Sequence, residues 1–195
     1  MKLVLVGTGY VGLVSGSCFA EFGYEVICVD KDEFRISELK KGKCPFFEPG
    51  IEELLSKHRD QTKLLSFTSS LPEAMEGADI IFITVGTPSK RLEEDADLSA
   101  VWNVAKDIAN NIKKYTLVVT KSTVPVGTTQ EIKKIISKIV PKENFDVVSN
   151  PEFLREGSAI NDFMRPDRII IGTDNEKSIK IMKELYRPLY LLETP

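Results

Sequence analysis

The stretch "KLVLVGTGYVG", residues 2–12, decides the fold of this chain. Its first part, "KLVLV" (2–6), is short and mostly apolar, as a buried parallel strand should be. The next part, "GTGYVG" (7–12), fits the pattern G-x-G-x-x-G, and a helix is predicted from about Val11 to Phe22. Asp30 follows the second predicted strand, "EVICV" (25–29). A strand, a glycine turn, a helix and an acidic residue in this order predict a dinucleotide site.

The glycines of this pattern have separate physical tasks. Gly7 permits the tight turn, Gly9 lets the backbone approach a pyrophosphate, and Gly12 lets the helix pack closely on the strand. Next to Tyr10 and Val11, the helix N-terminus offers free N–H groups and a favourable dipole to an anion. The alternative is a glycine turn that binds nothing, or that binds another nucleotide. We expect all five residues to belong to a cofactor site.

Asp30 indicates which dinucleotide this site takes. Its carboxylate can accept hydrogen bonds from the adenosine ribose hydroxyls, and it would repel the extra phosphate of NADP. Lys31 weakens this preference slightly, and Arg35, one helical turn further on, could lie over the adenine or be solvated. NAD is therefore the expected cofactor.

Strand and helix patterns alternate through short connections along the rest of the chain. Further strands are predicted at 79–85, 116–122, 145–150 and 168–173, with a possible short one at 189–195. Further helices are predicted at 32–42, 50–58, 98–114, 128–140 and 175–189, the last one stopped by Pro188. This order predicts an α/β fold, a doubly wound Rossmann-type parallel sheet with helices on both faces. We expect one NAD-binding domain over residues 1–195, with the polar segment 86–99 as its most irregular part.

The composition argues against several classes of partner and site. The net charge is −3 and the Lys and Arg residues are spread along the chain, so no nucleic-acid partner is expected. The apolar runs are too short for a membrane span, and the N-terminus lacks the features of a signal peptide, so a cytoplasmic location is expected. An odd number of cysteines argues against a disulfide framework: we expect buried thiols at Cys18 and Cys28 and leave Cys44 open. His58 is the only histidine, so no metal site is expected.

Three further strand ends carry polar residues beside Gly or Pro. They are "VGTP" (85–88), "KSTVPVGT" (121–128) and "SNPEFLREG" (149–157). The Thr-Pro and Val-Pro pairs in the first two could simply terminate strands. In an open parallel sheet, however, ligands bind at the carboxyl ends of the strands. All three ends would lie on the same edge as the glycine turn, and we therefore expect one shared site.

These motifs, in this order and spacing, resemble the N-terminal half of the UDP-glucose 6-dehydrogenases, in the nucleotide-sugar dehydrogenase family. The resemblance covers residues 1 to about 173, and "FFEPGIEELL" (46–55) is similar to a further segment of that family. GDP-mannose dehydrogenase is the nearest sibling, and "PDRIIIG", after "NPEFLREG", favours the UDP-glucose enzyme. The resemblance implies NAD-dependent oxidation of UDP-glucose to UDP-glucuronate, a twofold oxidation at C6 through a cysteine thioester that water hydrolyses.

The resemblance also implies roles for particular residues. Glu152 would be the general acid/base that works with the hydrolytic water, and Thr123 would help to hold that water. The substrate site would be lined by Glu152, Phe153, Leu154, Arg155 and Glu156. The NAD site would include Val11, Asp30, Arg35, Thr87, the backbone near Ser122, and Glu156 at the nicotinamide end. A carboxylate near a bound water can take its proton if partial burial raises its pKa. Arg155 could instead form a local ion pair with a nearby glutamate.

The cysteine expected from the resemblance has no counterpart in this sequence. In the family it lies in a glycine-rich segment of the type "GGSCFPKD", and the 195 residues contain no such segment. Cys18 falls inside the first predicted helix and is not a candidate. We therefore expect this chain to supply the NAD site and part of the substrate site without turning over UDP-glucose alone, and the full-length protein to be a homodimer.

Two other hypotheses stay open. A non-catalytic NAD-binding module would have no use for a water-activating pair such as Thr123 and Glu152. A hydroxy-acid dehydrogenase would need a general base, and His58 is badly placed for that role.

Overall fold

In the computed structural model, which describes residues 1–88 and 96–191, six parallel strands form one sheet in the order β3-β2-β1-β4-β5-β6. The strands are β1 (Lys2–Val6), β2 (Glu25–Val29), β3 (Leu65–Thr68), β4 (Ile80–Ile83), β5 (Thr116–Thr120) and β6 (Phe145–Ser149). The strand order reverses between β1 and β4, which is the arrangement of a doubly wound Rossmann-type sheet. The predicted fold class is confirmed.

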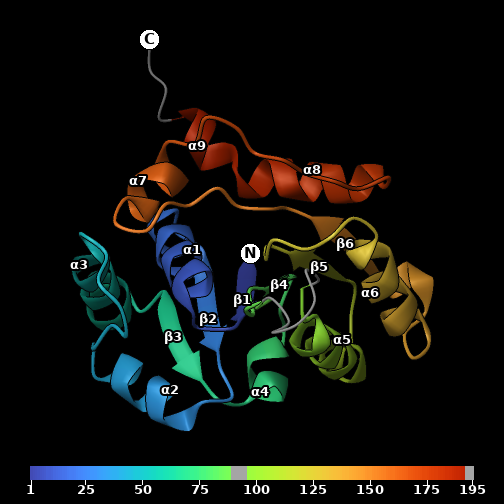
Figure 1. Cartoon of the computed structure of the whole chain (residues 1–195), viewed down its shortest axis with the longest axis horizontal. Helices are drawn as coiled ribbons and strands as arrows, with labels where there is room; N and C mark the ends of the chain where they lie inside the picture. Colours follow the sequence, from blue (N-terminus) through green and yellow to red (C-terminus); the bar gives the residue numbers. More distant parts are fainter. Residues whose placement is uncertain (89–95, 192–195) are drawn as a thin grey trace.

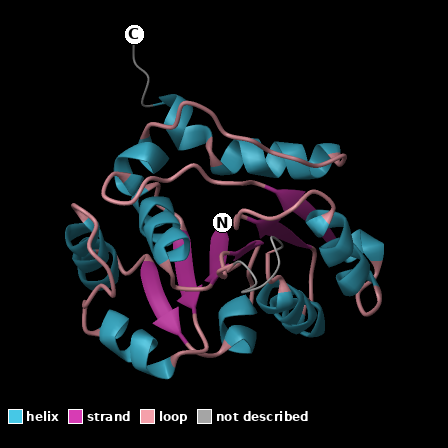
Figure 2. Cartoon of the chain, viewed as in Figure 1, coloured by secondary structure: helices cyan, strands magenta, loops and turns pink. Residues whose placement is uncertain are grey.

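Helices cover both faces of this sheet (Figures 1 and 2). One face packs against α1 (Tyr10–Glu21), α2 (Glu33–Lys40), α3 (Ile51–Ser56), α7 (Ala159–Met164) and α8 (Glu176–Leu185). The other face packs against α4 (Leu71–Met75), α5 (Ser99–Asn111) and α6 (Thr128–Ser137). A π-helical turn (Lys57–Gln61) extends α3, a 3-10 turn (Lys142–Asn144) precedes β6, and α9 (Arg187–Leu191) follows α8.

The hydrophobic core has two halves because side chains alternate along each strand. In β1, Leu3 and Leu5 point to the α1 side, whereas Val4 and Val6 point to the α5 side. At the centre of the α1 side, Phe19 lies between the rings of Phe82 and Phe163, with centroid distances of 5.1 Å and 5.0 Å. These near-continuous apolar strands are typical of a sheet that is covered on both faces.

Two predicted strands are wrong. The segment 168–173 forms only an isolated antiparallel bridge, between Ser149 and Gly172, beside the edge strand β6. Its alternating apolar pattern is real, since Ile169 and Ile171 pack on the core while Ile170 is exposed, but its backbone pairs with β6 at that one point. Of the segment 189–195, the part up to Leu191 belongs to helix α9, and the rest lies outside the described residues.

The remaining differences concern short elements and helix ends. β3, α4 and α7 were not predicted. Pro188 does not stop the last predicted helix, since α8 already ends at Leu185 and Pro188 is the second residue of α9, where a missing N–H is tolerated. Half of the segment 86–99, expected to be irregular, lies outside the described residues.

Candidate functional site

The glycine turn connects β1 to α1 at the point where the strand order reverses. Such a switch point opens a crevice at the carboxyl ends of the strands, where α/β sheets bind nucleotides. The hydroxyl of Thr84, just after β4, fixes the turn by donating to the carbonyl oxygens of Val6 at 3.0 Å and Gly7 at 2.9 Å. The predicted motif therefore stands where the fold can use it.

The three glycines of the turn differ in what a side chain would meet. A Cβ atom on Gly7 would lie 2.8 Å from the carbonyl oxygen of Thr84, and one on Gly12 would lie 1.9 Å from the carbonyl oxygen of Gly7. A Cβ atom on Gly9 would meet no atom of the described chain within 4 Å, apart from its own neighbours in sequence. Internal packing thus accounts for Gly7 and Gly12. The open space at Gly9 fits a ligand that lies directly against the backbone, as a pyrophosphate would.

The N-terminus of α1 faces this space. Gly9 is the N-cap residue and offers no side-chain acceptor, and the first turn contains no acidic residue. The first N–H groups of a helix have no partner within the helix. Those of Tyr10, Val11 and Gly12 can therefore donate to an anion, which also gains from the helix dipole.

Asp30 lies at the carboxyl end of β2, beside the glycine turn. Its Oδ2 accepts from the N–H and the hydroxyl of Thr8, both at 2.8 Å, and lies 3.5 Å from Nη1 of Arg35. Its Oδ1 accepts from the N–H of Asp32 at 3.1 Å and can accept a second donor. Burial alone would raise the pKa of Asp30, but these hydrogen bonds and the Arg35 charge outweigh it and hold the pKa below its ordinary value. Asp30 is therefore a fixed, charged acceptor at neutral pH.

The loops after β4 and β5 are hydrogen-bonded to each other. The hydroxyl of Thr87 donates to the carbonyl oxygen of Thr123 at 3.0 Å. The hydroxyl of Ser122 donates to the carbonyl oxygen of Val85 at 2.7 Å. Ser122 is buried, whereas Thr123 is exposed. The β4 and β5 residues predicted for the NAD and water sites thus belong to one connected pair of loops.

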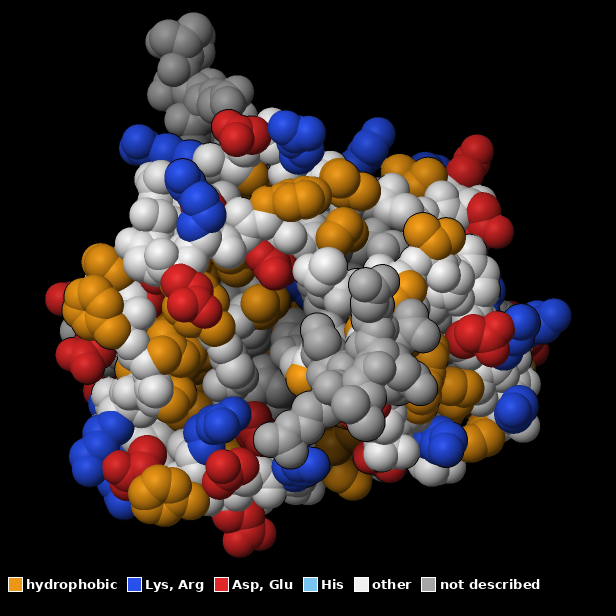
Figure 3. Space-filling view, viewed as in Figure 1, with side chains coloured by type: hydrophobic (Ala, Val, Ile, Leu, Met, Phe, Trp, Pro, Cys, Tyr) orange, Lys and Arg blue, Asp and Glu red, His pale blue; other side chains and the backbone are white. Residues whose placement is uncertain are grey.

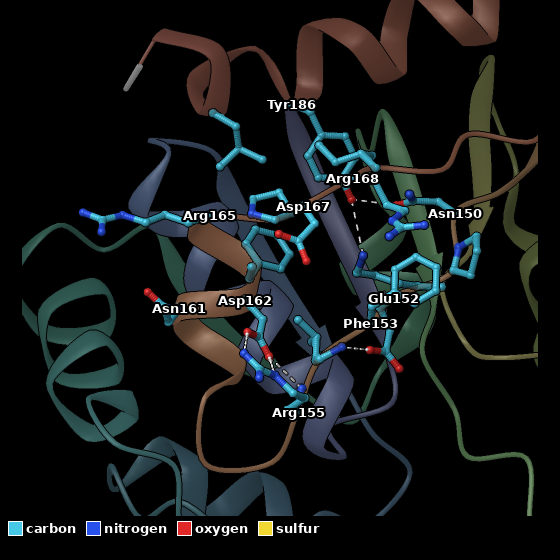
Figure 4. A pocket seen from close by; sticks show the side chains of 17 residues that line it. Asn150, Glu152, Phe153, Arg155, Asn161, Asp162, Arg165, Asp167, Arg168 and Tyr186 are labelled. Atoms are coloured by element: carbon cyan, nitrogen blue, oxygen red, sulfur yellow. Dashed lines mark hydrogen bonds and ion pairs between the residues drawn. The ribbon is translucent and has the colours of Figure 1, made fainter. Parts of the chain in front are cut away.

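The loop after β6 forms one wall of a cavity of about 610 Å³ (Figure 4). Asn150, Glu152 and Phe153 line it from this loop, and Phe163 of α7 faces them. Glu152 is half-buried, and its Oε2 accepts from the N–H of Leu154 at 2.5 Å. Because Thr120 pairs with Ser149, Thr123 and Glu152 each lie three residues beyond paired positions, on the same edge of the sheet.

Of the remaining predicted substrate residues, Leu154 and Arg155 line this cavity, whereas Glu156 is not among its lining residues. Arg155 forms a bidentate ion pair with Asp162 of α7, with Nη2–Oδ1 and Nε–Oδ2 distances of 2.7 Å and 3.1 Å (Figure 4). The local ion pair considered from the sequence exists, although its partner is an aspartate and not a glutamate. Phe153 and Glu156 are exposed, and Leu154 packs against the core.

Sequence reasoning missed Lys121, the first residue after β5. It is 4% exposed and lines the same cavity as Glu152. Its Nζ donates to the hydroxyl of Tyr186 at 3.3 Å, which donates to Oδ1 of Asn150 at 2.6 Å, and Nζ lies 5.5 Å from the centre of the Phe163 ring. Burial lowers the pKa of Lys121 to about 8, against the opposing effect of the Glu152 charge. The available signal was a cation placed directly at the carboxyl end of a wholly buried strand.

Sequence reasoning also missed Glu48, which lies in the segment 46–55. It is buried, and it accepts a hydrogen bond from the hydroxyl of Tyr10. An acidic residue between two phenylalanines and Pro-Gly was the signal, because an isolated carboxylate in such a segment needs partners once it is buried.

The three cysteines do not reach the cavity. Cys18 and Cys28 are buried as predicted, and burial raises the pKa of each thiol to about 12. Cys44 is half-buried, and burial raises its pKa as well. None of the three is among the residues that line the cavity.

Within 1–88 and 96–191, no group of three or more His, Cys, Asp and Glu side chains lies together as a metal site would require. None of the helices in those ranges is long and apolar enough to cross a membrane. On the face shown in Figure 3, Lys and Arg side chains are interspersed with Asp and Glu.

The strand order, the glycine turn and Asp30 define a dinucleotide-binding Rossmann domain. The chain matches the NAD-binding domain of the UDP-glucose/GDP-mannose dehydrogenase family over residues 1–190. It therefore belongs to that family, and NAD is the cofactor of this domain.

Individual relatives agree with this assignment. The UDP-glucose 6-dehydrogenase of Rhizobium meliloti is 54% identical over 197 aligned positions, which cover 100% of this chain and 45% of the relative. A ternary complex of GDP-mannose dehydrogenase from Pseudomonas aeruginosa has a TM-score of 0.92 at 37% identity, covering 96% of this chain and 44% of the other. A UDP-glucose dehydrogenase from Pyrobaculum islandicum has a TM-score of 0.91 at 38% identity, with the same coverage. The chain thus spans a little under half the length of these relatives.

Proposed function

We propose that this chain is the NAD-binding half of an enzyme that oxidises UDP-glucose to UDP-glucuronate, and that it supplies the NAD site and one wall of the substrate site. The observation that carries the proposal is the convergence of four strand ends on one edge of the sheet. The turn after β1 is tied to Thr84 after β4, the β4 loop to the β5 loop through Thr87 and Thr123, and β5 to β6 through the bond from the N–H of Asn150 to the carbonyl oxygen of Thr120 at 2.9 Å.

The residues of this edge divide into two neighbouring sites. Gly7, Gly9, Gly12 and Asp30 suit the pyrophosphate and the adenosine ribose, and bound NAD supplies the hydride acceptor of the oxidation. Glu152 suits proton transfer, because a half-buried carboxylate at a cavity wall can exchange a proton with a water held there.

UDP-glucose is favoured over GDP-mannose as the substrate. Support comes from the 54% identity to a UDP-glucose 6-dehydrogenase over the full length of this chain. A non-catalytic NAD-binding module is the second candidate. The cavity argues against it, because a module that only binds NAD has no need of Glu152 and a buried Lys121 lining one cavity together.

We also propose that these 195 residues alone do not complete the oxidation. A thioester requires an accessible thiolate, and the thiols of Cys18 and Cys28 are buried with pKa values raised to about 12. Cys44 is half-buried and does not line the cavity.

The first test is a calorimetric titration of the chain with NAD, with NADP as the second ligand and Gly9→Ala as the control variant. The Gly9→Ala protein should keep its melting temperature, because the added methyl group meets no atom of the described chain. It should nevertheless lose NAD binding, because the methyl group fills the space of the pyrophosphate. Equal NAD affinity in both proteins would refute the cofactor geometry.

The second test adds UDP-glucose or GDP-mannose to the NAD-saturated chain. We expect heat of binding with UDP-glucose and none with GDP-mannose, and no NADH absorbance with either. Sustained NADH production would contradict the proposal that the chain is inactive alone, and binding of GDP-mannose only would reassign the substrate.

A further inference from the structure

Glu48 joins three segments that are far apart in the sequence. Its Oε2 accepts from the hydroxyl of Tyr10 and from the N–H of Gly157, the latter at 2.8 Å, and its Oε1 accepts from the N–H of Ile160 at 3.3 Å. The N–H of Gly157 also lies 2.9 Å from the Tyr10 hydroxyl, which is itself 3.4 Å from the carbonyl oxygen of Arg155. One carboxylate thus holds the start of α1, the end of the β6 loop and the start of α7.

This carboxylate is costly to bury. Glu48 is 4% exposed, and none of its hydrogen bonds or ion pairs in the described part of the chain involves Lys, Arg or His. A buried carboxylate without a cation is tolerated only when N–H and O–H donors satisfy it. Those donors come from the two segments that the proposed function uses, which indicates a role beyond filling a loop.

The other contacts of Glu48 make this connection stiff. The Tyr10 ring packs on Phe46 with a centroid distance of 4.7 Å, so both ends of the phenol are held. Behind Glu48, the N–H of Ile51 donates to its carbonyl oxygen at 3.1 Å, and Gly50 begins α3 with a φ of +84°. Burial and the Glu48 hydrogen bond raise the pKa of Tyr10 to about 12, so the hydroxyl stays protonated as a donor at neutral pH.

Tyr10 is also part of the proposed cofactor site. It is the first residue of α1, and its own N–H is among those that can donate to the pyrophosphate. A ligand that binds at the N-terminus of α1 therefore contacts a residue whose side chain is hydrogen-bonded to the loop 152–157.

We propose that Glu48 is a positioning residue that, through Tyr10, couples NAD at the glycine turn to the loop 152–157 that would bind the nucleotide sugar. The inference rests on the proposed function, since it takes that loop as the substrate loop. Coupling of this kind is reciprocal, so substrate on the loop would strengthen NAD binding by the factor by which NAD strengthens substrate binding.

The test follows the backbone amides of Gly157 and Ile160 by heteronuclear NMR while NAD is titrated into the isotope-labelled chain. Tyr10→Phe removes the hydroxyl and keeps the ring, and Glu48→Gln keeps the shape and removes the charge. Tyr24→Phe is the matched control, because that hydroxyl donates to two carbonyl oxygens of α8 at the other end of α1, both at 3.1 Å.

In the unmodified chain and in Tyr24→Phe, the signals of Gly157 and Ile160 should shift with the same NAD dependence as those of Gly9 and Gly12. In Glu48→Gln, the glycine-turn signals should still shift, with an NAD affinity within about fivefold of the original, while the loop signals no longer respond. In Tyr10→Phe, which keeps the backbone N–H at the cofactor site, the loop signals should likewise stop following those of the glycine turn. If only the loop response is lost, the hydrogen bonds of Glu48 and Tyr10 transmit NAD binding to the loop. A purely structural role would not give this result.

Two outcomes would overturn the inference and leave the proposed function intact. One is an unmodified chain whose glycine turn responds to NAD while its loop does not, and the other is a loop that responds equally in all four proteins. If no amide responds in any protein, the NAD assignment fails, and the inference fails with it. Should Glu48→Gln not fold, the unmodified chain and Tyr10→Phe still decide the question.

Discussion

At the scale of single residues, the proposed NAD site centres on one carboxylate. Asp30 is held by both donors of Thr8 and keeps an acceptor position on Oδ1. That the glycines, the helix start and Asp30 lie together could be predicted from the sequence, because they fall within thirty residues and follow a fixed pattern. Lys121 and Glu48 were missed because their importance arises only when distant segments are brought together.

We predict that Asp30→Ala weakens NAD binding by about 10- to 100-fold, since a hydrogen bond to a charged group contributes roughly 1.5–3 kcal/mol. NADP binding should change much less, so the preference for NAD narrows. Because the pKa of Asp30 is held below its ordinary value, NAD affinity of the unmodified chain should be constant as the pH falls from about 8 to 5. Calorimetric titration across this pH range measures both effects.

Asp32→Asn is the control for this prediction. Asp32 caps α2 by accepting from the N–H of Arg35 at 3.0 Å, and asparagine can make the same cap. NAD affinity should therefore be unchanged in Asp32→Asn. An Asp30→Ala protein with the affinity of the unmodified chain would show that the ribose is not bound here.

Lys121 gives a prediction about stability. Its pKa is lowered to about 8 in the folded chain, so between about pH 8 and its ordinary pKa of 10.5 the unfolded chain binds more protons than the folded one. Over that interval the Lys121 contribution makes the folded state more stable as the pH rises. Lys121→Met should therefore raise the free energy of unfolding at about pH 7, by on the order of 2 kcal/mol, and the gain should shrink above about pH 8.

Denaturant unfolding at several pH values measures this difference. Lys133→Met is the matched control with the opposite sign, because Lys133 donates to Asp146 at 3.0 Å and its pKa is raised, chiefly by that hydrogen bond. If the Lys121→Met protein were less stable than the unmodified chain at neutral pH, interactions in the folded chain would have to offset the cost of burying the charged ammonium group. A costly lysine at the cavity is otherwise best explained by a functional role.

At the scale of secondary-structure elements, the clarity of the hydrophobic pattern decided what could be predicted. The helices α5 and α6 are amphipathic, and the strands β1, β4, β5 and β6 are mostly apolar runs. β3 and β4 both span four residues, but β4 (IIFI) is wholly apolar whereas β3 (LSFT) carries two polar residues, and α4 and α7 show no clear period. The segment 168–173 has the composition of a strand, but composition does not reveal that it meets the edge strand at a single bridge.

Side-chain hydrogen bonds, and not a seventh strand, join neighbouring helices to this edge of the sheet. Asp146 of β6 is 1% exposed and accepts from the hydroxyl of Ser178 in α8 at 2.7 Å and from Nζ of Lys133 in α6 at 3.0 Å. Burial alone would raise the pKa of Asp146, but these donors outweigh it and hold the pKa below its ordinary value of 3.8. One carboxylate therefore ties α6 and α8 to the edge of the sheet.

We predict that Asp146→Asn lowers the free energy of unfolding at about pH 7 by roughly 2 kcal/mol, because it removes the charge that both donors face. A carboxyl group whose pKa is lowered on folding stabilises the fold at pH values above its ordinary pKa. This contribution is lost as the pH falls through the folded-state pKa. The difference between the two proteins should therefore shrink below about pH 4. Thermal melts at neutral and acidic pH measure it.

Asp174→Asn is the control for this element. Asp174 lies 3.9 Å from the same lysine, but its side chain is 93% exposed, so its removal should leave the melting temperature unchanged. Equal destabilisation by both substitutions would contradict the conclusion that Asp146 ties α6 and α8 to the edge of the sheet.

At the scale of the whole molecule, the buried thiols lie inside the elements that form the proposed cofactor site. Cys18 is in the second half of α1, the helix that follows the glycine turn. Cys28 is in β2, two residues before Asp30. Both are 0% exposed, so a thiol reagent reaches them only when the sheet and α1 separate. Cys44 is half-buried in a loop and needs no such opening.

We therefore predict that a thiol reagent modifies native chain in two phases: Cys44 first, then Cys18 and Cys28 at a rate that reports opening of the core. NAD binds the closed form, so a concentration 100 times its Kd should slow the second phase by about 100-fold and leave the first phase unchanged. In Gly9→Ala, NAD should slow neither phase. Mass spectrometry of the modified thiols over time follows each cysteine separately. If NAD did not slow the modification of Cys18 and Cys28 in the unmodified chain, the dinucleotide would not be bound where α1 meets β1.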